Sequence, residues 1–351
     1  MRSLVYTGPR QLEWREAPEP VLDADHQALV RPIASAACDL DRRIVAGATP
    51  MKGPFAIGHE AVGEVLEVGE VAAAGGLRPG MRVVIPWHLS CGACAQCLAR
   101  RPGNCTSTPP LASYGTPLGG HHGGLFDDAV RVPWAAYALV PLPSDLAPSL
   151  AVSCPDQMAD AYRAVAPTLT EHPGASVLVV GGTASLGLWV VMFAAALGAG
   201  EIVYADTDPE AAALARTLGA TRTIVGEVPD RVNGDFALAV DVGGQAEATL
   251  ACALRSVAPG GTAVGRCIYF GAPPVPYWDL YTTGVSFVTG LPHATPYVAE
   301  VMDLLRTGAA DPRAVFSEPL PYDTAPEALL EPPRKPVFVR APRHPTGDAG
   351  P

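Results

Sequence analysis

The run SVLVVGGTASLGLWVV, residues 176–191, decides the fold, because it has the pattern of a buried β-strand, a glycine-rich turn and the start of a helix. Similar strand and helix patterns follow it, with EIVYAD before PEAAALARTLGA and then FALAVDV. Strands that alternate with amphipathic helices predict a parallel sheet with crossover helices. Free N–H groups and the helix dipole at such a turn favour a pyrophosphate, so the run also predicts a nucleotide site.

The glycine frame of this turn is irregular. Read back from Gly187, a GxGxxG frame gives Gly182 but places Ala184 at the middle position, and Gly181 indicates a turn one residue longer. Asp206 ends the next β-like run, 19 residues after Gly187, where a carboxylate can accept both ribose hydroxyls. No arginine immediately follows it, so NAD is predicted rather than NADP; the alternative is an ordinary βαβ unit with a solvated aspartate. The predicted cofactor-binding residues are Gly181, Gly182, Ala184, Leu186, Gly187 and Asp206.

Four cysteines share the run SCGACAQCLARRPGNC, residues 90–105, with the spacing CxxCxxCx7C. Zn²⁺ accepts four thiolates in a tetrahedral shell, so this spacing predicts a closed, structural zinc site. Two disulfides or an iron–sulfur cluster are the alternatives. Nothing at the N-terminus resembles a signal peptide, which predicts a cytoplasmic protein and argues against disulfides. The predicted ligands are Cys91, Cys94, Cys97 and Cys105.

Length and composition set wider bounds. A chain of 351 residues predicts two domains, and 48% hydrophobic with 17% charged residues is a globular composition. A net charge of −11 disfavours nucleic acid and anionic membranes as partners. The most apolar stretch, residues 176–198, is interrupted by GGTAS and does not predict a membrane span. The Pro- and Gly-rich tail, residues 341–351, is expected to fray.

The first part of the chain has a different pattern. Short β-like runs punctuated by Pro and Gly fill residues 3–140, which predicts a β-rich domain. Candidate metal ligands outside the four-cysteine run are Cys38 in AACDLDRRIVAG, His59 in AIGHEAVGEV, and either Cys154 or Asp156 in AVSCPDQMADAY. Taken alone, a residue of each of these types is more often an ordinary packed residue than a metal ligand. The late strand-like run KPVFVR could extend the parallel sheet or return to the first domain.

The motif GHEAVGEVLEVG, the four-cysteine lobe, the glycine-rich βα unit and DVGG…PGGTAVG, in this order, resemble the zinc-containing medium-chain alcohol dehydrogenases over nearly the whole chain. The resemblance implies a GroES-like β-rich catalytic domain at residues 1–157 and 291–351, with the zinc lobe at about 88–106. It implies a Rossmann domain, a doubly wound parallel sheet, at residues 158–290. It further implies two Zn²⁺ per chain, an active site in the cleft between the domains, and a homodimer or homotetramer.

The family pattern also bears on the third ligand. Family members use Cys, Asp or Glu there, followed six residues later by an aromatic residue, and counting back from Tyr162 gives Asp156 rather than Cys154. The resemblance therefore implies a catalytic zinc held by Cys38, His59 and Asp156. It also implies that Glu60 approaches the metal or orients a neighbour of it.

Two positions depart from the family pattern. Leu40 stands where the family has a Ser or Thr that relays the alcohol proton, and a leucine cannot relay protons. Asp160 stands where a Thr lines the nicotinamide pocket, and we hypothesise that it is the replacement base. The alternative is that Asp160 binds a polar substrate or points away. His121 and His122 could likewise reach a substrate, but a surface loop is the favoured interpretation.

The implied function is zinc-dependent hydride transfer between an alcohol or polyol and NAD, with an aldehyde or ketone as the reverse substrate. The nearest branch is that of the formaldehyde, secondary alcohol and sugar dehydrogenases. The run CDLDRRIVAG is similar to a sugar dehydrogenase motif, so a sugar is the alternative substrate. A relative that binds zinc or nucleotide without turnover is the alternative of another class.

Overall fold

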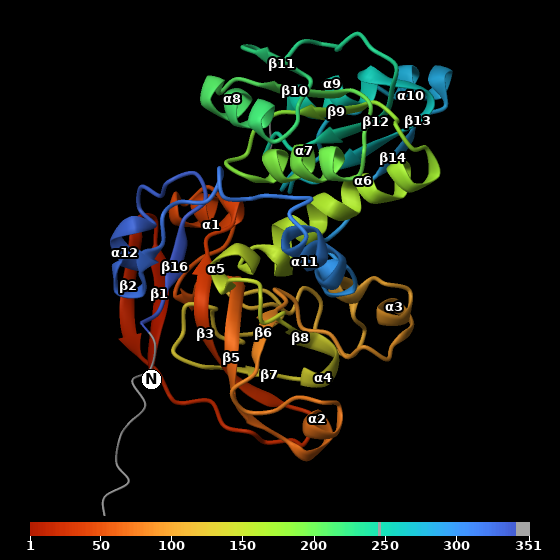
Figure 1. Cartoon of the computed structure of the whole chain (residues 1–351). Coiled ribbons are helices and arrows are strands. Elements are labelled where there is room, and N and C mark those ends of the chain that lie inside the picture. Colours follow the sequence, from red (N-terminus) through yellow and green to blue (C-terminus); the bar gives the residue numbers. More distant parts are fainter. Residues whose placement is uncertain (245–246, 342–351) are drawn as a thin grey trace, which may run out of the picture.

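A computed structural model of the chain describes residues 1–244 and 247–341. Figure 1 shows two parts, a parallel sheet flanked by helices and a β-rich part built mainly from the first half of the chain. The predicted fold class, a β-rich domain with a doubly wound parallel sheet, is confirmed. The exact domain boundaries stay predictions. The predicted fraying tail lies, apart from residue 341, outside the described residues.

The parallel sheet has six strands in the order β11-β10-β9-β12-β13-β14. All its neighbours pair in parallel. The chain moves outward from β9 in one direction and then, from β12, in the other, so the topological switch point lies between β9 and β12. The strands are β9 (Val177–Val180), β10 (Ile202–Asp206), β11 (Arg222–Val225), β12 (Phe236–Asp241), β13 (Val257–Gly265) and β14 (Ser286–Val288).

Helices cover both faces of this sheet. Val177 and Val179 of β9 belong to the buried cluster that contains residues of α6 and α7, whereas Leu178 and Val180 belong to the cluster that contains residues of α9. This alternation explains why β9 has an unbroken apolar run, since both of its faces are buried. The helices are α6 (Ala159–Glu171), α7 (Leu186–Ala196), α8 (Pro209–Thr217), α9 (Glu247–Ser256) and α10 (Tyr277–Thr283).

The β-rich part holds a seven-stranded sheet in the order β15-β16-β3-β5-β6-β8, with β7 also paired to β3. Its strands are β3 (Ala28–Ala36), β5 (Glu60–Val68), β6 (Arg82–Ile85), β7 (Val130–Val132), β8 (Val140–Pro141), β15 (Leu320–Pro321) and β16 (Val337–Val339). A second sheet joins β2 (Gln11–Glu16), β1 (Arg2–Gly8) and β4 (Phe55–Ala56). Because β16 pairs antiparallel with β3, the run KPVFVR returns to the first part of the chain.

Short helices complete the β-rich part and the junction. They are α1 (Asp39–Val45), α2 (Glu70–Ala74), α3 (Ala95–Leu98), α4 (Ala135–Ala138), α5 (Pro148–Ala151), α11 (Val298–Arg306) and α12 (Ala325–Ala328). Single turns lie at η1 (Pro102–Asn104), η2 (Cys154–Met158), η3 (Thr295–Tyr297) and η4 (Tyr322–Thr324). The π-helical turn η2 continues directly into α6, and α11 packs against η2, α5 and α6. Figure 1 shows α11 and the start of α6 between the two parts.

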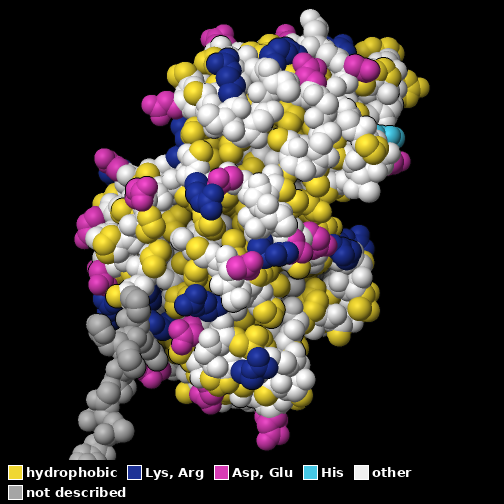
Figure 2. All heavy atoms as spheres, in the orientation of Figure 1, with side chains coloured by type: hydrophobic (Ala, Val, Ile, Leu, Met, Phe, Trp, Pro, Cys, Tyr) yellow, Lys and Arg dark blue, Asp and Glu magenta, His cyan; other side chains and the backbone are white. Residues whose placement is uncertain are grey.

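The surface carries charges of both signs. Figure 2 shows Lys and Arg side chains interspersed with Asp and Glu on the face in view, over both parts of the molecule. Within residues 1–244 and 247–341, every helix is too short or too polar to cross a membrane.

Candidate metal centres and dinucleotide site

The four cysteines of residues 90–105 come together in the lobe that contains α3 (Figure 1). Their sulfur atoms lie within 4.8 Å of one another, and Cys94 Sγ lies 3.9 Å from Cys105 Sγ. Four sulfurs that are each about 2.3 Å from a tetrahedral Zn²⁺ are about 3.8 Å apart. Helix α3 begins after Cys94 and η1 ends before Cys105, so these two turns fold the loop back on itself. The lobe fits a closed site of four thiolates.

Backbone N–H groups surround these sulfurs. Cys91 Sγ accepts N–H bonds from Ala93 at 3.4 Å and from Cys94 at 3.3 Å. Bonds from the N–H groups of Cys97 and Thr106 lower the pKa of Cys94 to about 5. Burial raises the pKa of Cys97 to about 12, so a thiolate at that position needs a cation beside it.

Cys38, His59 and Asp156 meet at the junction of the two parts. Cys38 is the N-cap of α1, His59 directly precedes β5, and Asp156 lies in η2. One ligand atom from each lies within 4.8 Å of the others, and His59 Nε2 is 3.6 Å from Asp156 Oδ2. All three side chains are buried. In the part of the chain that the structure describes, this trio and the four cysteines are the two groups whose geometry could hold a metal ion.

Asp41 holds two of these ligands in place. Its Oδ2 accepts the N–H of Cys38 at 2.8 Å, and its Oδ1 lies 3.4 Å from His59 Nδ1. This contact leaves Nε2 as the nitrogen that faces the other ligands. Gly58 has a φ of +95°, and a Cβ there would lie 2.3 Å from the Phe126 ring. The turn before His59 therefore requires glycine.

Cys154, the alternative third ligand, is not part of this trio. It packs in the hydrophobic core, and burial raises the pKa of its thiol. The structure thus brings Asp156 to Cys38 and His59 in the frame that the resemblance implied.

The donor set of the trio fits a zinc ion. Burial and the Asp156 carboxylate raise the pKa of the Cys38 thiol well above its usual range, so a thiolate there needs a cation beside it. Thiolate, imidazole and carboxylate are the ligands that zinc takes in proteins. Three protein ligands leave a fourth position for another molecule, whereas the four cysteines leave none.

A buried ion pair lies next to the trio. Glu60 follows His59 and is 0% exposed, and Lys335 Nζ lies 2.5 Å from its Oε2. Lys335 also donates to Gln157 Oε1 at 2.7 Å, and Ser153 Oγ donates to Glu60 Oε1 at 2.8 Å. Burial raises the pKa of Glu60 to about 7, although the Lys335 ammonium opposes the rise. Lys335 therefore links η2 and β5 to the segment that leads into β16.

The glycine turn after β9 lies at the carboxyl edge of the parallel sheet, beside the switch point where such folds bind ligands. Gly181 has a φ of +84°, and a Cβ on Gly182 would lie 2.0 Å from Asp206 Oδ2. Asp206 is buried against the turn, where Tyr204 Oη donates to its Oδ2 at 2.5 Å and the Asp208 N–H donates to its Oδ1 at 3.0 Å. The structure brings the predicted turn and the predicted aspartate together.

The remaining turn residues lead into α7. Ala184 precedes the N-cap Ser185, and Leu186 and Gly187 are the first two residues of the helix. Asp39 reaches this point from α1. Its Oδ2 accepts the N–H groups of Ser185 and Leu186 at 3.2 Å each, and its Oδ1 accepts Ser185 Oγ–H at 2.9 Å. The turn and Asp206 therefore fit a dinucleotide, while a carboxylate of the protein holds the amides expected to meet a phosphate.

Asp160 lies four residues after Asp156 and is buried among arginines. Its Oδ1 accepts bonds from Arg163 Nε at 3.2 Å and Nη2 at 2.7 Å, and it lies 3.7 Å from Arg266 Nε. The Arg266 side chain is 2% exposed. These contacts engage Oδ1, one of the two oxygens of the carboxylate. Its role as a proton relay stays a prediction.

Family models match segments in both parts of the chain. Residues 24–144 match the alcohol dehydrogenase GroES-like domain model, and residues 185–305 match the zinc-binding dehydrogenase model. The NADP-dependent isopropanol dehydrogenase of Clostridium beijerinckii is 30% identical over 84% of this chain and 82% of its own length. A probable zinc-binding alcohol dehydrogenase of Mycobacterium tuberculosis is 27% identical over 93% and 83%.

The chain belongs to the zinc-containing medium-chain alcohol dehydrogenase family. The structure of the alcohol dehydrogenase TADH from Thermus sp. ATN1 superposes with a TM-score of 0.85 at 30% identity, covering 97% of this chain and all of that one. The predicted GroES-like and Rossmann folds are confirmed. This dehydrogenase is thus an alcohol dehydrogenase-like oxidoreductase.

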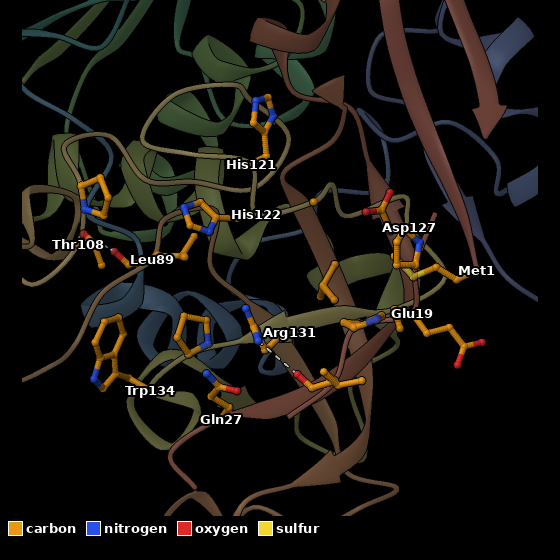
Figure 3. Close-up of a pocket in the computed structure, with 18 of the residues that line it drawn as sticks. Met1, Glu19, Gln27, Leu89, Thr108, His121, His122, Asp127, Arg131 and Trp134 are labelled. Atoms are coloured by element: carbon orange, nitrogen blue, oxygen red, sulfur yellow. Dashed lines mark hydrogen bonds between the residues drawn. The ribbon is translucent and has the colours of Figure 1, made fainter. Parts of the chain in front are cut away.

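His121 and His122 of the dehydrogenase line a different hollow, shown in Figure 3. It has a volume of about 510 Å³ and is walled by residues that include Gln27, Arg131 and Trp134. None of the seven candidate metal ligands lines it. His122 Nε2 lies 3.0 Å from Gly119 O within the same loop. The two histidines therefore lie on a loop, outside both metal-ligating groups.

Several residues of the dehydrogenase site were not predicted from the sequence. Asp41 had a local signal, because it lies three residues after Cys38 and forms a capping box with it. Lys335 stands at the start of the run KPVFVR, but nothing local indicates that it pairs with Glu60. Neither Arg266 nor the contact of Asp39 with α7 has a sequence signal. Leu40 packs against the buried cluster of the three-stranded sheet.

Proposed function

We propose that this dehydrogenase transfers hydride between a small alcohol or polyol and NAD, and from NADH to the aldehyde or ketone in reverse. The observation that carries the proposal is the meeting of Cys38, His59 and Asp156 beside the dinucleotide turn. Asp39, next to ligand Cys38, touches the first residues of α7. This contact supports the proposal that the metal-ligating trio and the glycine turn belong to one site.

When bound, a zinc ion at the trio would supply Lewis acidity to an alcohol oxygen, and NAD would supply the hydride acceptor. The chain's own residues orient these groups. Asp41 Oδ1 lies 3.4 Å from Nδ1 of the His59 ring, and Lys335 and Ser153 bind the carboxylate of Glu60, the next residue. Burial of all three ligands keeps water from the ligand atoms, which strengthens their electrostatic interactions.

We propose NAD rather than NADP as the cofactor. A 2′-phosphate at Asp206 would meet a buried carboxylate, and Asp208 follows two residues later. The nearby guanidinium of Arg334 is engaged by Asp208 Oδ2 at 2.8 Å. Like-charge repulsion supports the choice. The four-cysteine lobe is proposed to hold a second, structural zinc.

A sugar is the second candidate substrate, and one observation favours it. The side chains of His88, His293 and Arg266 are buried, and each has nitrogen atoms without a hydrogen-bond partner among the described residues. The electrostatic contacts of His88 reach both Asp156 and His293. A polyhydroxylated substrate would offer hydroxyls to such groups.

The proposal is tested by NAD⁺ reduction with zinc-loaded protein across primary alcohols, secondary alcohols, polyols and aldoses. We expect turnover with one of these classes and a loss of more than about a hundredfold in Asp156→Ala. Cys154→Ala, two residues away and outside the trio, is the matched control and should keep most of the activity. Zinc and NADH binding without turnover on any substrate would instead support the non-catalytic alternative.

A further inference from the structure

We infer that Asp39 is a built-in competitor of the dinucleotide's phosphates, so that it sets the affinity of this dehydrogenase for its cofactor. The inference rests on the proposed function in that the ligand is taken to be a dinucleotide. It goes beyond that function because it assigns to Asp39 a role in cofactor affinity rather than in hydride transfer.

The contact is made by a charged group at a helix that favours one. Asp39 is buried, and its carboxylate accepts both N–H groups at the start of the eleven-residue helix α7 and the hydroxyl of Ser185. Bonds of this kind to an ionised carboxylate are about twice as strong as neutral ones. The helix dipole adds to them. An anion of the protein thus already satisfies the amides at this turn.

The position of the contact makes the competition direct. The same two amides follow a glycine turn at the carboxyl edge of the sheet, with Asp206 on the other side of Gly182. A dinucleotide whose ribose meets Asp206 brings its pyrophosphate to the N-terminus of this helix. Two anions cannot share one pair of N–H donors, so Asp39 must withdraw when the phosphates bind.

The surroundings supply cations for the incoming phosphates. Arg43 Nη1 donates to Gly244 O at 2.8 Å, and Arg334 Nη1 donates to Ala184 O at 3.3 Å. Both guanidinium groups therefore contact carbonyls of the loops that end β9 and β12, and Arg334 also pairs through Nη2 with Asp208 Oδ2 at 2.8 Å. A diphosphate offers them stronger acceptors than these carbonyls. The cations favour the ligand, whereas the Asp39 carboxylate opposes it.

A polar chain connects this contact to the metal-ligating trio. Ser185 Oγ lies within hydrogen-bond distance of both Asp39 Oδ1 and Gln157 Oε1, at 2.9 and 2.8 Å. Lys335 donates to the same Gln157 oxygen and pairs with Glu60. Withdrawal of Asp39 frees the Ser185 hydroxyl to donate fully to Gln157. Cofactor binding is thereby linked to groups beside the trio.

The test is a fluorescence titration of NADH against zinc-loaded wild type, Asp39→Asn, Asp39→Ser and the exposed control Asp303→Asn. We expect the dissociation constant to fall at least about tenfold in both Asp39 variants and to stay unchanged in the control. Inorganic pyrophosphate should raise the melting temperature of Asp39→Ser more than that of wild type.

Equal or weaker NADH binding by the two folded Asp39 variants would overturn the inference while leaving the proposed function intact. Loss of the native fold in both variants would also overturn it, because Asp39 would then be a structural helix cap. If none of the four proteins binds NADH, the inference and the proposed cofactor fail together.

Discussion

Asp160 is held by two arginines, and its partners bear on what it does in this site. Arg163 and Arg266 both point their guanidinium nitrogens at its Oδ1, within 3.7 Å. The side chains of Asp160, Arg163 and Arg266 are 5%, 13% and 2% exposed. Without the carboxylate, two buried cations would face each other, so the geometry favours a positioning role for Asp160.

We predict that Asp160→Asn destabilises the protein by about 3 kcal/mol, because it leaves buried arginine charges uncompensated. Urea unfolding measures this change. The exposed Asp145→Asn removes a surface contact with Arg306 and should change stability by less than about 0.5 kcal/mol. The pH profile of turnover should keep its shape in Asp160→Asn. Loss of one limb of that profile would instead establish Asp160 as the replacement relay.

Some residues of this site could be predicted from the sequence, and others could not. The seven candidate ligands could be named because their spacing carries the chemistry or matches a family pattern. Asp39 and Lys335 could not, because their partners lie 146 and 275 positions away in the chain. Only the packing of the two parts shows that these charges meet Ser185 and Glu60.

At the scale of elements, the strands and helices of the parallel sheet were predictable and the turns beside the trio were not. The runs SVLVV, EIVYAD and FALAVDV have uniform apolar patterns, and they form β9, β10 and β12. The π-helical turn η2 has no such pattern. Its buried polar residues depend on Lys335 and β5 for their partners, which local sequence does not encode.

The edge strand β14 exposes apolar side chains. It ends the six-stranded sheet, and its Phe287 and Val288 are 38% and 44% exposed. Tyr277, Trp278 and Tyr281 of α10 are also exposed. An exposed apolar edge is a template for pairing with a second strand. We propose that two copies of the chain pair at β14, which accords with the homo-oligomer that the family resemblance implied.

We predict that Val288→Asp weakens self-association by about tenfold or more, because a charge would be buried at the paired edge. Val225→Asp on β11, at the opposite edge of the same sheet and 51% exposed, is the matched control. Sedimentation velocity over a concentration series measures both. A wild-type chain that sediments as a monomer, or equal association of both variants, would contradict the prediction.

At the scale of the whole molecule, the two parts form one site because three segments cross between them. Helix α6 leads out of η2, Asp39 reaches α7, and β16 brings Lys335 back to β5. The sequence alone left the placement of β16 open, since a short apolar run pairs equally well with either sheet. Its pairing with β3 brings the ion pair of Lys335 and Glu60 next to the trio, where both side chains are buried.

We propose two metal sites with different roles, one closed by four cysteines and one left open by Cys38, His59 and Asp156. The most direct test is the zinc content per chain of wild type, Asp156→Ala and Cys94→Ser, measured by mass spectrometry of the purified metal-loaded proteins. We predict two zinc ions in wild type and about one in each variant, because Asp156→Ala loses the metal of the open site and Cys94→Ser loses the metal of the lobe. Equal zinc content in wild type and Asp156→Ala would contradict it.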